Sequence, residues 1–151
     1  MKLEAGMDAP DFSAVDADGH RWTLSGLRGQ KVVLYFYPAD DTRGCTAQAC
    51  DFRDSQTEWK EAGYVVLGVS AQGSDSHRAF AQKNSLNFPL LVDEDLSLAD
   101  SYGTRAEPED GIPPVSNRST FVIDEEGKIV EALYGVRWQG HIDELRKKLS
   151  V

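Results

Sequence analysis

The chain has 151 residues, of which 40% are hydrophobic and 27% are charged, and its formal net charge is −9. A chain of this length can bury its own core without disulfides or metals, so we expect one domain over residues 1–151. The acidic balance disfavours nucleic acid and anionic membranes as partners, because both attract basic surfaces.

The N-terminal residues "MKLEAGMDAPDF" carry acids and a proline where a secretory signal has an apolar core. We therefore expect a cytoplasmic protein. In a reducing cytoplasm two cysteines are more often free, catalytic or redox-active than joined in a structural disulfide.

A β-hairpin is predicted first, from residues 12–16 and 21–24 on either side of the turn sequence "ADGH". Residues 32–37 and 64–70 are apolar on both faces, and each run precedes a polar segment of helical length. This is the pattern of central parallel strands that are covered by helices.

The second half of the chain predicts further alternation of helices and strands. We expect a helix over 75–84, a strand over 88–93, a short helix over 96–102, a hairpin from 119–124 and 128–135, and a closing helix over 139–149 with Ile142, Leu145 and Leu149 on one face. The order predicts an α/β protein with a thioredoxin-like fold, in which helices flank a central mixed β-sheet. A flavodoxin-like sheet is the alternative, since periodicity alone does not set strand order.

Both cysteines of the chain lie in the stretch "YFYPADDTRGCTAQAC", residues 35–50. Pro38 has no N–H to donate, so the buried strand should end before it. Asp41 or Thr42 then caps a helix that begins around Arg43 and carries Cys45 in its first turn. A helix dipole contributes about 0.3 to 1 kcal/mol there, and about 2 kcal/mol in a buried site. Full ionisation of the thiol therefore needs a cation from elsewhere in the chain.

The spacing of Cys45 and Cys50 limits how they can react with each other. Five residues of regular helix separate their Cα atoms by about 8.6 Å and place them on different faces. A disulfide tolerates about 7 Å at most. A bond between them thus requires the first turns of the helix to unwind.

Other roles for the cysteines remain open on these residues alone. Cys50 is also compatible with a small buried residue on the inner helix face. A zinc site is disfavoured because His20, His77 and His141 lie in unrelated elements without ligand spacing, and we expect them on the solvated surface. The Cys-x-x-Cys pattern of thioredoxin-type reductases is absent from the sequence.

Residues 38–45, "PADDTRGC", resemble the Pro-x-x-x-Thr-x-x-Cys motif of the peroxiredoxins. A second cysteine five residues after the first resembles the arrangement in the bacterioferritin comigratory protein branch of this family, also called peroxiredoxin Q. Residues 6–12, 68–95 and 117–129 also resemble segments of this family, so the likeness spans about residues 5–149.

The resemblance implies a thiol-dependent peroxidase that needs no metal or other cofactor. Cys45 would attack a hydroperoxide, Thr42 and Arg118 would hold the two peroxide oxygens, and Pro38 would shield the sulfur from water. Arg118 would thereby supply the missing cation.

The resemblance further implies that Cys50 resolves the sulfenic acid of Cys45 as an intramolecular disulfide. Thioredoxin, or alternatively glutaredoxin, would reduce this bond, and the protein would act as a monomer in cell redox homeostasis. Two positions depart from the family pattern, which often has proline at Arg43 and glutamate at Gln48. A thiol-disulfide oxidoreductase and a redox-sensing module on the same fold are the alternative functions.

Overall fold

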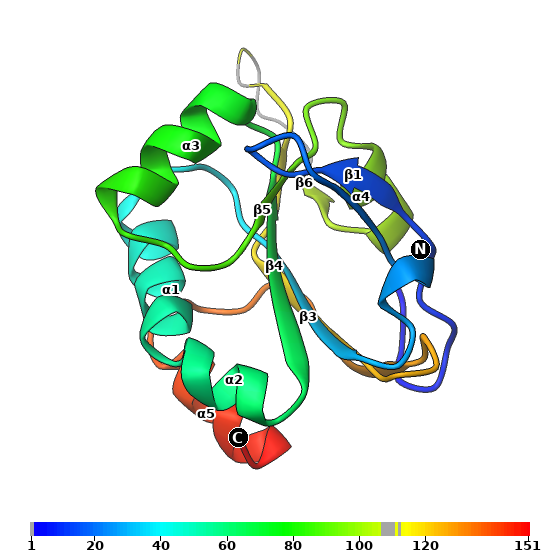
Figure 1. The fold of residues 1–151 in the computed structure, drawn as a ribbon. Helices are drawn as coiled ribbons and strands as arrows, with labels where there is room; N and C mark the ends of the chain where they lie inside the picture. The colour runs from blue at the N-terminus through cyan, green and yellow to red at the C-terminus, as the bar shows by residue number, and fades with distance from the viewer. Residues whose placement is uncertain (1, 107–110, 112) are drawn as a thin grey trace.

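A five-stranded mixed β-sheet forms the centre of the protein (Figure 1), whose computed structural model describes residues 2–106, 111 and 113–151. The strand order is β5-β4-β3-β8-β9. Their bounds are β3 Lys31–Phe36, β4 Tyr64–Ser70, β5 Leu90–Val92, β8 Ser119–Ile123 and β9 Ile129–Leu133. β3, β4 and β5 run parallel, whereas β8 and β9 pair antiparallel with their neighbours. The mixed sheet confirms the predicted thioredoxin-like fold and rules out the flavodoxin-like alternative, whose core strands all run parallel.

The central strand β3 is apolar after its first residue, Lys31, because the sheet is covered on both faces. Successive side chains of a strand point to opposite faces. One hydrophobic cluster accordingly contains Val32, Leu34 and Phe36, and the cluster on the other face contains Val33, Tyr35 and Tyr37.

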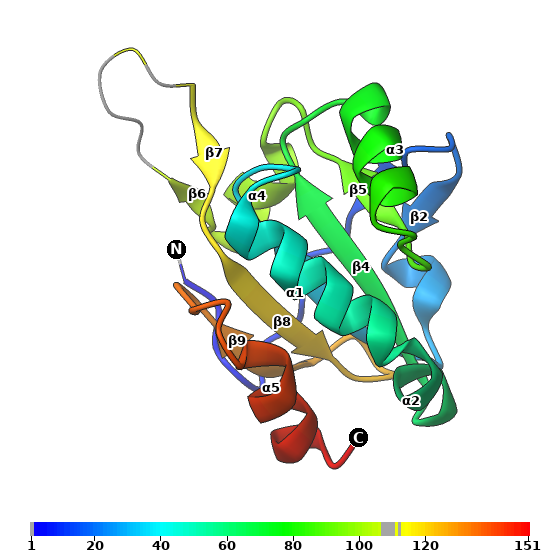
Figure 2. The same cartoon turned by 90° about the vertical axis from the view of Figure 1, so that its left-hand side faces the viewer.

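Among the described residues, four helices lie on one face of the sheet, and one helix and a hairpin lie on the other (Figures 1 and 2). The first group is α1 Arg43–Asp54, α2 Gln56–Glu61, α3 Ser74–Lys83 and α5 His141–Leu149. The second group is α4 Ser97–Tyr102 and the predicted hairpin of β1 Ser13–Val15 and β2 Arg21–Thr23. A short 3₁₀ turn, η1 Ser25–Leu27, follows β2.

The boundary between α1 and α2 was not predicted. Ser55 separates the two helices, and its hydroxyl donates to the carbonyl of Asp51 at 2.8 Å. A serine that bonds back to the preceding turn competes with the regular helix and favours a break.

Residues 103 to 118, for which no element is predicted above, contain a two-stranded ladder. β6 Arg105–Ala106 pairs antiparallel with β7 Val115–Ser116. The residues of this stretch numbered 107–110 and 112 lie outside the described part of the chain. In the described ranges no helix is long and apolar enough to cross a membrane.

The register of β3 and β8 determines what lies beside the start of α1. Phe36, the last residue of β3, pairs with Ser119, the first residue of β8. Arg118 directly precedes Ser119 and therefore lies next to the point where the chain leaves the sheet toward α1. Two segments about 80 residues apart in sequence are thus joined by strand pairing.

Candidate active site

The start of α1 was predicted correctly, but the manner of capping was not. Thr42 is the N-cap, with extended backbone angles φ −89° and ψ 156°, and its carbonyl accepts from the amide of Thr46 at 2.8 Å. Its hydroxyl does not bond to the free amides of the first turn. It donates instead to the carbonyl of Ala39 at 3.1 Å. The exposed hydroxyl is therefore held over the loop that precedes the helix.

Cys45 lies in the first turn of α1 with 2% of its surface exposed. Its Sγ accepts a hydrogen bond from Nη2 of Arg118 at 3.2 Å. A guanidinium beside the sulfur and the free amides of a helix start both favour the thiolate, which is the nucleophilic form. The structure thus brings together the cysteine and the cation that the sequence could connect only through the resemblance.

Gln48 holds the second arm of Arg118. Nη1 of Arg118 donates to Oε1 of Gln48 at 2.6 Å, and Gln48 is fully buried one turn after Cys45. The amide is neutral, so this contact orients the guanidinium without cancelling its charge. The sequence marked Gln48 as a departure from the family pattern but gave it no role.

Cys50 lies on a different part of α1, away from Arg118. It is half-buried, and its Sγ is 4.0 Å from Oδ1 of Asn84, which follows α3. Both cysteines are free, and the helix between them is intact. Cys50 is therefore not a fully buried core residue.

Pro38 lies two residues after the end of β3 and is half-buried. The last sheet bond before it runs from the amide of Tyr37 to the carbonyl of Val69 at 3.1 Å. The Pro38 carbonyl accepts from Nε2 of Gln72 at 3.4 Å. Pro38 and Thr42 therefore lie at the two ends of a short loop, and Cys45 follows within the next turn.

Trp138 covers the first turn of α1, which the sequence did not reveal. A methyl group at Gly44 would lie 2.4 Å from Cδ1 of Trp138, so the indole packs directly on the glycine. The guanidinium carbon of the exposed Arg43 lies 5.9 Å from the centroid of the same ring. No sequence signal connects these residues, because Trp138 belongs to the loop between β9 and α5.

The expectation that all histidines are solvated was wrong for two of the three. His20 is exposed, but His77 and His141 are buried. Helical spacing could have revealed His77, because it precedes the buried Phe80 by three residues on α3. In the described part of the chain, no three His, Cys, Asp or Glu side chains gather as a set of metal ligands.

His141 is hydrogen-bonded to the strand that follows Arg118. Its Nε2 lies 2.9 Å from Oγ1 of Thr120, two residues after Arg118 on β8. Burial lowers the pKa of His141, and the nearby Arg118 lowers it further, against an opposing effect of Glu144. A neutral imidazole in this place adds no second positive charge beside the guanidinium.

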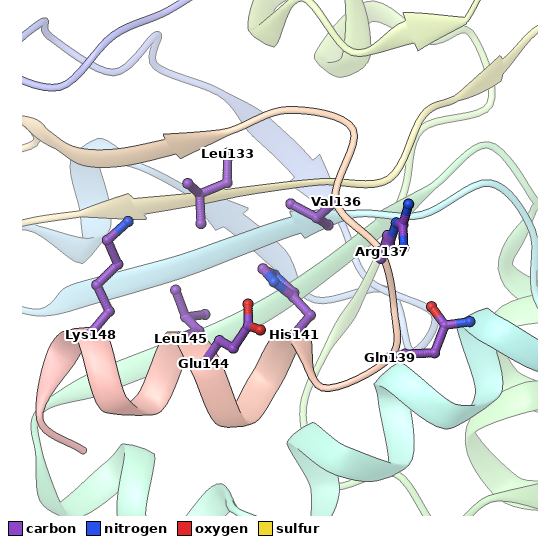
Figure 3. Close-up of a pocket in the computed structure, with 8 residues that line it drawn as sticks. All are labelled: Leu133, Val136, Arg137, Gln139, His141, Glu144, Leu145 and Lys148. Atoms are coloured by element: carbon purple, nitrogen blue, oxygen red, sulfur yellow. The ribbon is translucent and has the colours of Figure 1, made fainter.

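A surface hollow of about 330 Å³ opens beside this histidine, between α5 and the loop that follows β9 (Figure 3). Figure 3 shows Arg137 and Lys148 at its two ends and Glu144 between them. None of the five residues that the resemblance proposes for catalysis lines this hollow. It is therefore not the place where Cys45 meets a substrate.

Comparison with known proteins places this geometry in a family. Residues 5–132 match the model of the AhpC/TSA family. A protein of Mycobacterium tuberculosis that carries the name peroxiredoxin is 43% identical over 152 residues, which cover 99% of this chain and 97% of the relative. The chain belongs to the peroxiredoxins. As a peroxiredoxin it is a thiol peroxidase, and the predicted family is confirmed.

Two solved structures place this peroxiredoxin in the predicted branch. A mutant of peroxiredoxin Q from Xylella fastidiosa has a TM-score of 0.92 and 30% identity, with 99% of this chain and 97% of that one covered. The bacterioferritin comigratory protein of Xanthomonas campestris has a structure that was determined to study its alkyl peroxide reduction activity. It has a TM-score of 0.89 and 33% identity, with 97% of this chain and 98% of that one covered. The thioredoxin-like fold and the peroxiredoxin Q likeness thus agree.

Proposed function

We propose that Cys45 is the peroxidatic cysteine of this peroxiredoxin and that its substrates are hydrogen peroxide and small organic hydroperoxides. The observation that carries the proposal is the 3.2 Å contact between Cys45 Sγ and Arg118 Nη2 at the start of α1. The alkyl peroxide activity named for the Xanthomonas campestris relative supports the substrate class.

The first step is a displacement at oxygen. The Cys45 thiolate attacks the terminal oxygen of the hydroperoxide, which keeps its hydrogen and becomes the OH of the sulfenic acid. The O–O bond breaks, and the leaving alkoxide or hydroxide takes up the proton that the thiol released on ionisation, so that alcohol or water leaves. Cys45 becomes a sulfenic acid. Donors that face the developing charge on the leaving oxygen lower the barrier of such a step. Arg118 serves as one of these donors, the hydroxyl of Thr42 serves as another when it turns from the carbonyl of Ala39 toward the substrate, and Pro38 shields the sulfenic acid from solvent.

Cys50 carries out the second step. Its thiol attacks the sulfur of the Cys45 sulfenic acid, a disulfide forms, and water leaves. The two residues lie on different faces of the intact α1, so the start of this helix opens before they react. A half-buried Cys50 needs little further exposure for this reaction.

A dithiol reductant closes the cycle by two-electron exchange with the disulfide. Thioredoxin fits this task, with glutaredoxin as the alternative. Because both cysteines belong to one chain, the cycle needs no second subunit, which supports a monomer. The two free cysteines and the need for a thiol reductant support a place in the cytoplasm.

Intact mass after one equivalent of hydrogen peroxide tests the proposal. Reduced wild-type protein is expected to lose two hydrogen atoms, and a protein whose mass does not change contradicts the cycle. Cys45→Ser should abolish peroxide consumption, whereas Cys50→Ser should complete one turnover and stop at the sulfenic acid. Equal residual activity in both variants would reject the assignment of roles.

A further inference from the structure

His77 of α3 is fully buried, and each of its ring nitrogens faces a hydrogen-bond acceptor. Its Nδ1 lies 2.6 Å from Oδ2 of Asp40, and its Nε2 lies 2.9 Å from the carbonyl of Leu91 on β5. The side chains of His77 and Asp40 are 0% and 3% exposed. A carbonyl can only accept, so Nε2 must carry a proton.

Asp40 is the hydrogen-bond partner of the other nitrogen. Burial raises the pKa of Asp40, but hydrogen bonds from His77 and Tyr37 outweigh burial and hold the pKa below its ordinary value. His77 and Asp40 form a buried hydrogen-bonded pair.

Asp40 is also the centre of a larger set of hydrogen bonds. The hydroxyl of Tyr37 donates to its Oδ1 at 2.6 Å, and the hydroxyl of Ser76 donates to its Oδ2 at 2.8 Å. The Asp40 amide donates to Oε1 of Gln72 at 3.0 Å. Nε2 of the same Gln72 donates to the carbonyl of Pro38. The partners come from the end of β3, from α3 and from the segment between β4 and α3.

These bonds connect to the chemistry through the loop that contains Asp40. The loop runs from Pro38 to Thr42 and leads directly into the turn that carries Cys45. None of the named partners of Asp40 belongs to α1. Opening the start of α1 therefore breaks none of these contacts.

A buried polar pair is weak evidence for stability, because desolvation of the two groups offsets their attraction. Its geometry is more specific than that of an apolar contact, since both partners must keep their positions to stay hydrogen-bonded. We propose that Asp40 and His77 are a positioning pair for the peroxidase reaction, which holds the Pro38–Thr42 loop against α3 both before and after α1 opens. This inference rests on the proposed role of Cys45.

The proposal separates the two chemical steps. Reaction with peroxide needs Pro38 and Thr42 correctly placed around the Cys45 sulfur, so it depends on the pair. Disulfide formation needs only the opening of α1, so it does not. A merely structural role predicts no such division, because general destabilisation would also change how often α1 opens.

Stopped-flow fluorescence of the reduced protein mixed with hydrogen peroxide measures both steps. In Asp40→Asn and His77→Gln we expect the second-order reaction to be slower by about 10- to 100-fold, as for catalytic groups misplaced by about 1 Å, while the rate of disulfide formation is unchanged. The double variant should be no slower than either single variant, because the pair acts as a unit. Equal slowing of both steps, or no slowing, would overturn the proposal.

Tyr102→Phe is the matched control. Tyr102 is also fully buried, but it packs on the opposite face of the sheet. The substitution removes one hydrogen bond, which the Tyr102 hydroxyl donates to the carbonyl of Pro10 at 2.7 Å. Its peroxide step should match that of wild type. If this step slows as much as in His77→Gln, loss of stability explains the effect and the proposal fails. Wild-type protein that does not react through Cys45 would instead reject the proposed function.

A measurement on wild-type protein covers the case in which the variants do not fold. Nitrogen-15 NMR of the His77 ring should show the same signals for its two hydrogen-bonded nitrogens in the reduced form and in the disulfide form. A change of the Nδ1 signal on oxidation would contradict the positioning pair.

Discussion

Arg118 and Cys45 are 73 residues apart in sequence, yet Nη2 of Arg118 donates to Sγ of Cys45 at 3.2 Å. The guanidinium is fixed from two directions, since Gln48 accepts from its other arm and the register of β8 against β3 places its backbone. The positive charge beside the sulfur is thus supplied by the sheet, and the helix supplies only its free amides.

Replacement of Arg118 should slow the peroxide reaction. In Arg118→Met we expect the second-order rate constant to fall by about 10- to 100-fold, because a hydrogen bond to a charged group is worth about 1.5 to 3 kcal/mol. Stopped-flow kinetics of the reduced variant measures this rate. Arg105→Met is the matched control, since Arg105 is exposed and pairs with Asp100. A rate in Arg118→Met equal to that of the control would show that Arg118 does not contribute to the peroxide reaction.

The rate of the peroxide reaction should depend on the hydroxyl of Thr42 more than on the shape of this side chain. Thr42→Val keeps the volume and loses the donor, so we expect a reaction with peroxide that is about tenfold slower, as for the loss of one ordinary hydrogen bond. Thr42→Ser retains the hydroxyl and should react nearly as fast as wild type. If the valine variant is as fast as the serine variant, the hydroxyl does not contact the substrate.

A methyl group at Gly44 should displace Trp138. Alanine is preferred over glycine in a helix by about 1 kcal/mol, but its Cβ would lie 2.4 Å from Cδ1 of the indole. Overpacking of this kind costs about 1 to 3 kcal/mol, so we expect Gly44→Ala to lower the free energy of unfolding. Urea denaturation measures the change.

Trp138→Ala provides the second arm of the same test. If the clash is the cause, Gly44→Ala should be neutral or stabilising in the Trp138→Ala background, where helix propensity alone remains. The same loss in both backgrounds would show that the two residues are not in contact.

Disulfide formation should unwind the start of α1. Amide hydrogen exchange over residues 43–50 is expected to be faster in the oxidised protein than in the reduced protein, because the intact helix holds the two Cα atoms too far apart for a bond. Cys50→Ser treated with peroxide is the control, since it cannot form the bond and should keep its protection. Equal protection of wild type in both redox states would contradict helix opening.

His141 should make the protein less stable in mild acid. Its pKa is lowered by burial in the folded protein, whereas in the unfolded chain it lies near 6.5. As the pH falls through 6.5, the unfolded state takes up a proton that the folded state does not, so the free energy of unfolding decreases. In His141→Asn this decrease should be smaller between about pH 7.5 and 5, as measured by urea denaturation. His20→Gln, at an exposed position, should retain the decrease of wild type.

Much of the fold could be read from the sequence because its signals are local. Strand β4 occupies the predicted residues 64–70, and α3, α4 and α5 begin within two residues of the predicted positions. Apolar runs bounded by turn residues set these elements without reference to the rest of the chain. The short ladder of β6 and β7 was missed because two-residue strands leave no periodic pattern.

Some of the proposed catalytic residues could likewise be identified from local sequence signals. Pro38, Thr42, Cys45 and Cys50 form one continuous motif, so the sequence by itself determined the order of strand end, loop and helix start around the sulfur. The motif also determined that the two cysteines cannot bond within a regular helix, since that follows from helix geometry alone.

Only the tertiary structure decided what surrounds this motif. The contact of Arg118 with Cys45 depends on the pairing of β8 with β3, the packing of Trp138 on Gly44 depends on the loop before α5, and the burial of His77 depends on the approach of Asp40. Each of these joins segments far apart in sequence, and a single sequence carries no local signal for such contacts. Strand register and helix packing, which fix them, arise only when the whole sheet and its covering helices assemble.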